Sequence, residues 1–179
     1  MYIYTLIVRG TMNRYSYERK DYTVAEIAYL AGIIDGEGSV YIGNFSCNAK
    51  TGTKYYQTNI EVTNTDLPLM NWLLNTFGGR NYTYSAKQTP TNSRRTAYRW
   101  IATGERVTHL CELLLPYVIT KKPQIEIMIK MRETFKPITG VKRGVQGIQI
   151  LDADILATRQ SYFEQMQTLH CRNYKNIKT

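Results

Sequence analysis

The segment that most constrains the fold of this chain is residues 24–35, with the sequence VAEIAYLAGIID. Thr23 before it suits an N-cap, and Glu26 stands where a capping box needs its acidic partner. Gly36 and Gly38 provide a natural end. The pattern therefore predicts a helix. Because this helix is apolar on nearly every side, it must be buried on more than one face.

One face of the predicted helix carries only small residues, because Ala28, Gly32 and Gly36 recur at every fourth position. Small residues at this spacing let two helices approach closely. Two copies packed through this face would bring their C-terminal ends, and therefore both Glu37 carboxylates, to one axis. We find no second copy of the helix in the remaining residues, so a second half would have to come from another chain.

Two pairs of segments with alternating polarity predict β-hairpins. The first pair is 39–45 and 54–64, joined by a long polar turn, and the second is 80–87 and 94–102. In 54–64, polar and apolar side chains alternate, which gives one hydrogen-bonding face and one mainly apolar face.

Further helices are predicted after each hairpin. One is opened by Asn64 or Thr65 and stopped by Gly78-Gly79; the next runs over 107–114, and another runs from Pro123 to about Phe135. The order is α-β-β-α-β-β-α-α, followed by a glycine-rich loop and a final helix over about 152–170. We expect an N-terminal extension (1–20), a mixed α/β (α+β) core (21–136), and a loop plus C-terminal helix packing on the core (137–179).

The composition favours a polyanionic partner. There are 23 Lys and Arg against 14 Asp and Glu among 179 residues, a formal charge of +9. Charge alone does not separate a nucleic-acid binder from a merely basic soluble protein, so the positions of the charges must decide.

Cysteine and histidine are sparse. Three distant cysteines and two histidines offer neither a zinc cluster nor a disulfide framework, which fits a reducing interior. The apolar run 1–8 is too short for a membrane span and lacks the flank of a signal peptide. We therefore expect no membrane association and no secretion.

The chemistry is carried by the nonapeptide that ends the first helix, Leu30-Ala31-Gly32-Ile33-Ile34-Asp35-Gly36-Glu37-Gly38. It resembles the signature of the LAGLIDADG homing endonucleases. The resemblance extends to Val62-Thr63-Asn64-Thr65-Asp66, to Phe77-Gly78-Gly79, and to Leu115-Pro116-Tyr117 leading to Lys121, and so covers roughly residues 24–135.

This resemblance implies the LAGLIDADG homing endonuclease fold, an α-β-β-α-β-β-α core with an antiparallel saddle-shaped sheet and extra C-terminal helices. A chain with one motif is expected to act as a homodimer on double-stranded DNA. The implied activity is a metal-dependent double-strand break in a long pseudo-palindromic site, with no small-molecule substrate. A free-standing, intron-encoded enzyme in the cytoplasm or nucleoid of a prokaryote, or in an organelle matrix, is the expected setting.

The same resemblance assigns the metal site. It makes Glu37 the metal-binding acid, assisted by the carbonyl of Gly36, and Mg²⁺ the expected ion because it prefers oxygen ligands. Mn²⁺ is expected to substitute, and Ca²⁺ to bind without supporting cleavage. For Asp35 we favour a structural role as a local cap or turn former.

Two further residues are catalytic candidates. Lys121 aligns with the active-site lysine of the family, whose charge can polarise water or neutralise phosphate charge. Lys122 is the adjacent alternative. The competing interpretation is that the two residues are only a solvated lysine pair before a helix. Asn64 falls where the family often has an amide that orders water, although it is equally suited to cap the next helix.

The hairpins are the expected DNA-reading ribbons, because alternate side chains of a β-ribbon can enter the major groove. On the first hairpin the predicted set is Ser39, Tyr41, Gly43, Phe45, Tyr55, Gln57, Asn59 and Glu61. On the second it is Asn81, Thr83, Ser85, Lys87, Arg94, Arg95 and Arg99. The competing interpretation is an ordinary solvated sheet face. We assign to the core Tyr82, Tyr84, Tyr98 and Trp100, and name as flanking phosphate contacts Lys142, Arg143, Arg159 and Arg172.

Three other functions remain open on this sequence. A LAGLIDADG protein can be a non-cleaving DNA-binding regulator or an intron RNA maturase; Glu37 and Lys121 argue against simple loss of catalysis but do not exclude maturase work. A generic β-sheet RNA binder would need exposed aromatic platforms.

Overall fold

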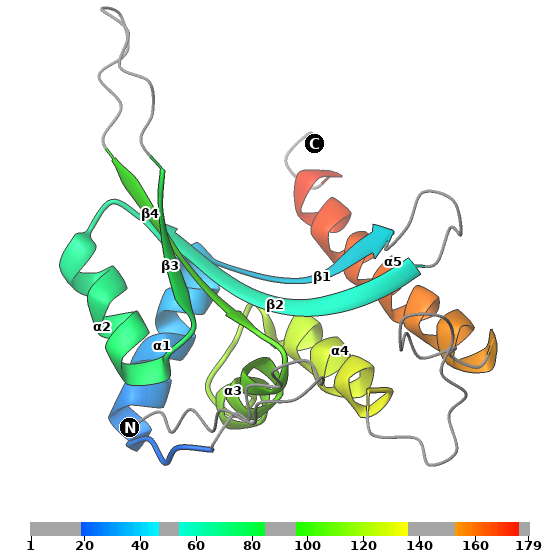
Figure 1. Cartoon of the computed structure of the whole chain (residues 1–179), viewed down its shortest axis with the longest axis horizontal. Helices are drawn as coiled ribbons and strands as arrows, with labels where there is room; N and C mark the ends of the chain where they lie inside the picture. Colours follow the sequence, from blue (N-terminus) through cyan, green and yellow to red (C-terminus); the bar gives the residue numbers. More distant parts are fainter. Residues whose placement is uncertain (1–18, 47–53, 85–95, 136–152, 176–179) are drawn as a thin grey trace, which may run out of the picture.

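The computed structural model describes residues 19–46, 54–84, 96–135 and 153–175 (Figure 1). The elements in chain order are α1 (Val24–Glu37), β1 (Gly38–Ser46), β2 (Lys54–Asn64), α2 (Leu67–Phe77), β3 (Arg80–Tyr84), β4 (Ala97–Thr103), α3 (Glu105–Leu114), α4 (Lys122–Glu133) and α5 (Ala153–Lys175). This is the predicted order, and it confirms the mixed α+β class.

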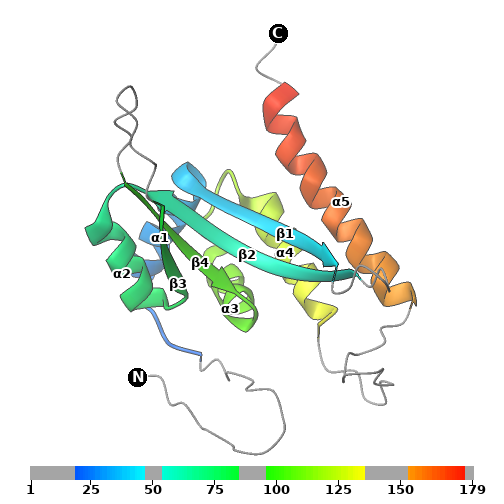
Figure 2. The same cartoon turned by 45° about the horizontal axis from the view of Figure 1, so that its top comes forward.

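The four strands form one antiparallel sheet in the order β1-β2-β4-β3. The sheet is strongly curved, and helices α1 to α4 lie on one side of it, whereas the opposite face of β1 and β2 is open (Figure 1). In the turned view α5 runs along the outside of β1 (Figure 2).

The core lies between the sheet and the helices, as the alternating patterns predicted. Pairing of Val40 with Ile60 and of Ile42 with Thr58 places these four residues on the helix-covered face, where all are buried. Trp100 is fully buried beside them and its indole N–H donates to the carbonyl of Gly78 at 2.6 Å, so the polar end of this large side chain is satisfied.

Helix α1 begins as predicted, with a capping box in which the Glu26 N–H donates to the Thr23 hydroxyl. Its C-terminal end passes directly into β1. A Cβ on Gly38 would lie 2.6 Å from the Cα of Ile34, so only glycine fits at this junction. There is consequently no loop between the helix and the strand.

Helix α2 begins differently from the prediction. Asp66 is its N-cap and accepts a hydrogen bond from the Leu69 N–H at 2.7 Å, in place of Asn64 or Thr65. Asn64 is thereby left to make a different contact, described below.

Helix α5 packs on β1 and α4. Met166 is fully buried, the Tyr56 hydroxyl donates to Gln160 at 2.6 Å, and His170 Nε2 lies 3.1 Å from the Val40 carbonyl oxygen. Arg159 is 5% exposed and donates to the hydroxyl and carbonyl of Thr134, which makes its predicted contact with phosphate wrong.

Two smaller findings bear on the sequence predictions. Cys111 is a free, fully buried thiol, and burial raises the pKa of this thiol. None of the helices in the described part of the chain is both long and apolar enough to span a membrane.

Candidate active site and nucleic-acid interface

The candidate active site is organised around Glu37, an exposed carboxylate in the last turn of α1. The side-chain amide of Asn64, the last residue of β2, donates to Glu37 Oε2. Asn64 Oδ1 in turn accepts the backbone N–H of Asp66 at 2.9 Å, which fixes the amide orientation. The structure thus brings together two of the three predicted catalytic residues.

Asp35 lies two residues before Glu37 and holds a distant segment. Its carboxylate accepts hydrogen bonds from the Ile119 N–H (2.7 Å), the Thr120 hydroxyl (2.9 Å) and the Lys121 N–H (2.9 Å). Partial burial works to raise the pKa of this carboxyl, but these donors outweigh it and the pKa lies below its ordinary value. Asp35 therefore has a structural role, as predicted, but it is not the local cap or turn former that we expected, because its donors belong to residues 119–121.

Lys121 occupies the N-cap position of α4 and is partly buried, whereas Lys122 is exposed. Its backbone is tied to the C-terminal end of α1 through Asp35, the end that also carries Glu37. The structure therefore places the third predicted catalytic residue at the same end of α1. This placement follows from the backbone hydrogen bond of Lys121 to Asp35, and not from a contact between the Lys121 and Glu37 side chains.

The end of α1 is chemically suited to a divalent cation. The carbonyl groups of a last helical turn, here including Gly36, lack helical partners, and the helix dipole is negative there. Together with Glu37 this is an oxygen-rich, negatively polarised position of the kind that Mg²⁺ prefers. Across the described ranges, no three His, Cys, Asp or Glu side chains gather in one place to hold a metal.

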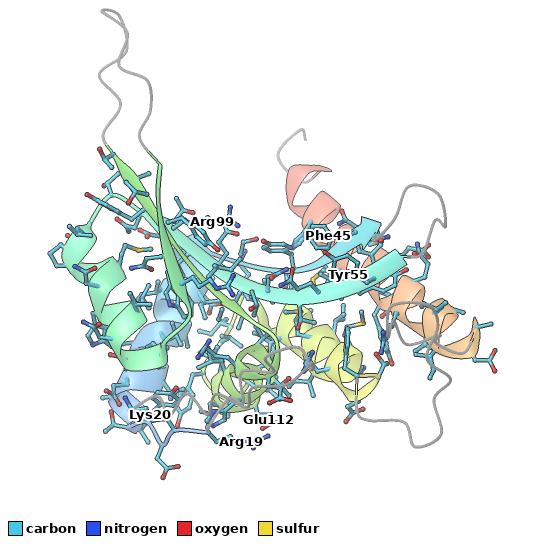
Figure 3. The ribbon with its side chains drawn as sticks, in the orientation of Figure 1. Arg19, Lys20, Phe45, Tyr55, Arg99 and Glu112 are labelled. Carbon is cyan, nitrogen blue, oxygen red and sulfur yellow. The ribbon has the colours of Figure 1, made fainter. Side chains whose placement is uncertain are left out.

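The open face of β1 and β2 carries the first predicted DNA-reading set. The cross-strand pairs are Ser39–Glu61, Tyr41–Asn59, Gly43–Gln57 and Phe45–Tyr55. All eight predicted residues consequently share one face, opposite to the core. Phe45 and Tyr55 are each 42% exposed and stack with ring centroids 5.2 Å apart (Figure 3).

Three residues of this set make polar side-chain contacts within the protein: Asn59, Glu61 and Tyr41. Asn59 is 2% exposed, and its amide donates to the Gln57 carbonyl at 3.2 Å. Glu61 Oε1 forms an ion pair with Arg99 Nε at 2.9 Å, while its other oxygen accepts the Tyr41 hydroxyl at 3.1 Å. The Glu61 carboxylate therefore orients Arg99, another residue of the predicted DNA-reading set, and is not directed only at the solvent.

The face predicted for the second hairpin is wrong at Asn81 and Thr83. Pairing of Asn81 with Trp100 and of Thr83 with Tyr98 places both residues on the helix side of the sheet. The Asn81 amide donates to the Met70 carbonyl at 3.0 Å, in α2.

The open face carries Arg80 and Tyr82 instead, in register with Ile101 and Arg99. Tyr82 is 44% exposed, with the Arg99 guanidinium 5.9 Å from its ring centre, so its predicted place in the core is also wrong. Trp100 and Tyr98 do contribute to the core. Six predicted contacts lie outside the described residues: Ser85, Lys87, Arg94, Arg95, Lys142 and Arg143.

The small-residue face of α1 is bare in the single chain. Ala28, Gly32 and Gly36 are exposed, and a Cβ added at either glycine would meet no atom within 4 Å. The apolar side chains of Val24 and Tyr29 on the same helix are 67% and 57% exposed. The other side of α1 is buried against the sheet and the neighbouring helices.

The sequence profile of one family, described as LAGLIDADG endonuclease, matches residues 30–126, more than half of the chain. The match begins at the first residue of the motif and extends past Lys121. The chain belongs to the LAGLIDADG endonuclease family. A comparison of this LAGLIDADG chain with curated proteins finds no match.

Solved structures of LAGLIDADG homing endonucleases have the same fold. I-CvuI in complex with the I-CreI target is 14% identical, with a TM-score of 0.61 over 81% of this chain and 82% of that one. The archaeal intron-encoded I-Vdi141I complexed with DNA is 15% identical, with a TM-score of 0.60 over 81% and 84%. I-SmaMI bound to cleaved DNA is 13% identical, with a TM-score of 0.58 over 87% of this chain but 48% of that one.

Proposed function

We propose that this chain is a site-specific DNA endonuclease that acts as a homodimer and makes a metal-dependent double-strand break in a long pseudo-palindromic site. The observation that carries the proposal is the position of Glu37. Its carboxylate, oriented by Asn64, lies where the bare face of α1 ends and the open face of the sheet begins. A metal-binding acid, a pairing surface and a DNA-reading surface are thereby joined at one junction.

The homodimer is supported by what one chain lacks. The small-residue face of α1 has no partner among the described residues, and those residues supply no complete metal-ligand cluster. Two α1 helices packed through this face would bring two Glu37 carboxylates to one axis. The chain also covers 48% of I-SmaMI, the share expected if that chain contains two such units.

In the proposed reaction each residue has a defined task. Glu37 and the Gly36 carbonyl hold the divalent cation, and Asn64 keeps the Glu37 carboxylate in one orientation. Lys121 supplies a positive charge toward the phosphate. When bound, Mg²⁺ stabilises the charge that develops during phosphodiester cleavage. We expect Mn²⁺ to substitute and Ca²⁺ to bind without supporting cleavage.

The curved open face is the proposed DNA-binding surface. It presents exposed Phe45, Tyr55 and Tyr82 together with Arg80 and Arg99, on a chain with a formal charge of +9. Arginines suit guanine edges and phosphates, and apolar rings suit thymine methyl groups. The substrate is then duplex DNA, and we infer an intracellular setting in which DNA is present.

The test is cleavage of a randomised duplex library with Mg²⁺, with Ca²⁺ and with chelator, followed by sequencing of the new ends. The wild type is compared with Glu37→Gln, and with Glu126→Gln as a matched change at another exposed carboxylate. We expect defined ends with Mg²⁺ only, lost in Glu37→Gln by roughly a hundredfold or more and kept in Glu126→Gln. Sequence-selective binding without new ends would instead indicate a non-cleaving regulator or a maturase.

A further inference from the structure

We propose that Asp35 is a positioning residue whose carboxylate clasps residues 119–121 and so fixes Lys121 relative to Glu37. This inference rests on the proposed function, because it assigns to Asp35 the task of completing that active site. The Asp35 carboxylate accepts hydrogen bonds from this distant segment, which is more than the end of a helix requires.

The clasp uses both oxygens of the carboxylate. Asp35 Oδ2 accepts the N–H of Ile119, and Oδ1 accepts both the Thr120 hydroxyl and the Lys121 N–H, all between 2.7 and 2.9 Å. Three consecutive residues therefore donate to one side chain. A shift of the segment by a single residue would break the whole set, since two N–H groups and one hydroxyl must face the two carboxylate oxygens at once.

Other contacts hold this segment only at its ends. Ile119 is 82% exposed, so its apolar side chain contributes no burial, whereas Val118 before it and Gln124 and Ile125 after it are buried. Lys121 caps α4 without any side-chain hydrogen bond to the helix. The Lys121 carbonyl accepts the Ile125 N–H at 3.0 Å, whereas the N–H groups of Ile119 and Lys121 donate to Asp35. The Asp35 carboxylate is therefore the contact that holds the N–H groups of this backbone.

The clasp connects Lys121 with Glu37 through one hydrogen bond and two residues of chain. Asp35 and Glu37 are two residues apart in the last turn of α1, and Asp35 contacts the Lys121 backbone directly. Lys121 is 84 residues further along the chain than Glu37. The Asp35 side chain therefore fixes the position of the Lys121 backbone relative to Glu37. A catalytic group must be held in position in this way.

Asparagine at position 35 is the sharpest change. It keeps one acceptor oxygen and replaces the other with an NH₂ group that would face an N–H donor of the segment. Thr120→Val removes one donor and retains the shape of the side chain, so it serves as the milder variant. Asp21→Asn makes the same chemical change at an exposed aspartate outside the site.

The first measurement is a double-mutant cycle of single-turnover cleavage rates with Asp35→Asn, Lys121→Ala and the double variant. We expect Asp35→Asn to slow cleavage by roughly 10- to 100-fold, with DNA affinity in Ca²⁺ unchanged within about twofold. Thr120→Val should slow cleavage less, and Asp21→Asn should not. In the Lys121→Ala background, Asp35→Asn should add less than about a twofold loss, because it acts through Lys121. Fully additive losses would overturn the inference.

The second measurement needs neither DNA nor metal. Amide hydrogen exchange at Ile119 and Lys121 should be at least about tenfold faster in Asp35→Asn, while exchange at the buried Leu30 of α1 stays unchanged. Equal acceleration at Leu30, or no acceleration at Ile119 and Lys121, would contradict the clasp. A wild-type protein that cuts no DNA would contradict the proposed function, and the exchange result would still decide whether the clasp exists.

Discussion

Arg159 is a charged side chain whose contacts are all internal. Its Nε donates to the Thr134 hydroxyl at 2.9 Å and one terminal nitrogen to the Thr134 carbonyl at 2.6 Å. The guanidinium also lies 4.0 Å from the ring centre of Phe135. Burial, with the neighbouring Arg132, lowers the pKa of this guanidinium, so its contacts have to offset a real desolvation cost.

We therefore predict that Arg159→Ala lowers the free energy of unfolding by about 2–4 kcal/mol, because it leaves the partly buried Thr134 carbonyl without its donor and a space beside Phe135. Urea denaturation monitored by circular dichroism measures this change. The control is Arg19→Ala, since Arg19 forms an exposed ion pair with Glu112 and should lose less than about 1 kcal/mol. Equal losses in the two variants would show that the contacts of Arg159 contribute nothing specific.

At the scale of the element, the junction of α1 and β1 depends on one glycine. A Cβ at Gly38 would lie 2.6 Å from the Cα and 2.8 Å from the carbonyl oxygen of Ile34. Both are backbone atoms of the last helical turn, so they cannot move aside as a flexible side chain can. The close approach of strand to helix therefore excludes any other residue.

Gly38→Ala should accordingly destabilise the protein by about 1–3 kcal/mol through overpacking of this turn. The measurement is thermal and urea unfolding without DNA. Ser39→Ala, at the next and exposed position of β1, should change the unfolding free energy by less than about 0.5 kcal/mol. An unchanged stability in Gly38→Ala would mean that the junction can relax without cost.

The elements were predictable from the sequence because their signals are local. The capping box of Thr23, the Gly78-Gly79 stop and the alternation in 54–64 each act within a few residues. The face of β3 was not predictable in this way, since a period of two fits either face equally well. Only the pairing of Asn81 with the buried Trp100 decides it.

The same distinction between local signals and distant contacts applies to the candidate site. Glu37 and Lys121 were identified from the motif and the family resemblance. The contacts that hold them, from Asn64 to Glu37 and from residues 119–121 to Asp35, join positions 27 and 84–86 residues apart. A pattern read along the chain carries no information on such pairs, because they are created when α1 packs against the sheet and contacts the segment that precedes α4.

For the whole molecule, the bare face of α1 predicts assembly. Gly32→Leu should leave the fold of the single chain intact, because a Cβ there meets nothing within 4 Å, but it should prevent close helix approach. Analytical ultracentrifugation should show a monomer at concentrations where the wild type is a dimer, and cleavage should be lost in parallel.

Ala157→Leu is the matched control for that experiment, since it adds an exposed leucine on α5. It should remain dimeric and active. A wild-type protein that is monomeric at the concentration where it cleaves would overturn the homodimer, and a dimeric Gly32→Leu would place the contact between copies elsewhere.

The direct passage of α1 into β1 at Gly38 leaves no loop between the proposed pairing helix and the proposed DNA-reading strand. In the proposed dimer, the crossing of the two α1 helices then sets the distance and rotation between the two ribbons. Each base pair added between half-sites turns one of them by about 35° about the duplex axis. Substitutions in the ribbons can therefore change which bases are read, whereas the spacing of the half-sites is inherited from the helix crossing.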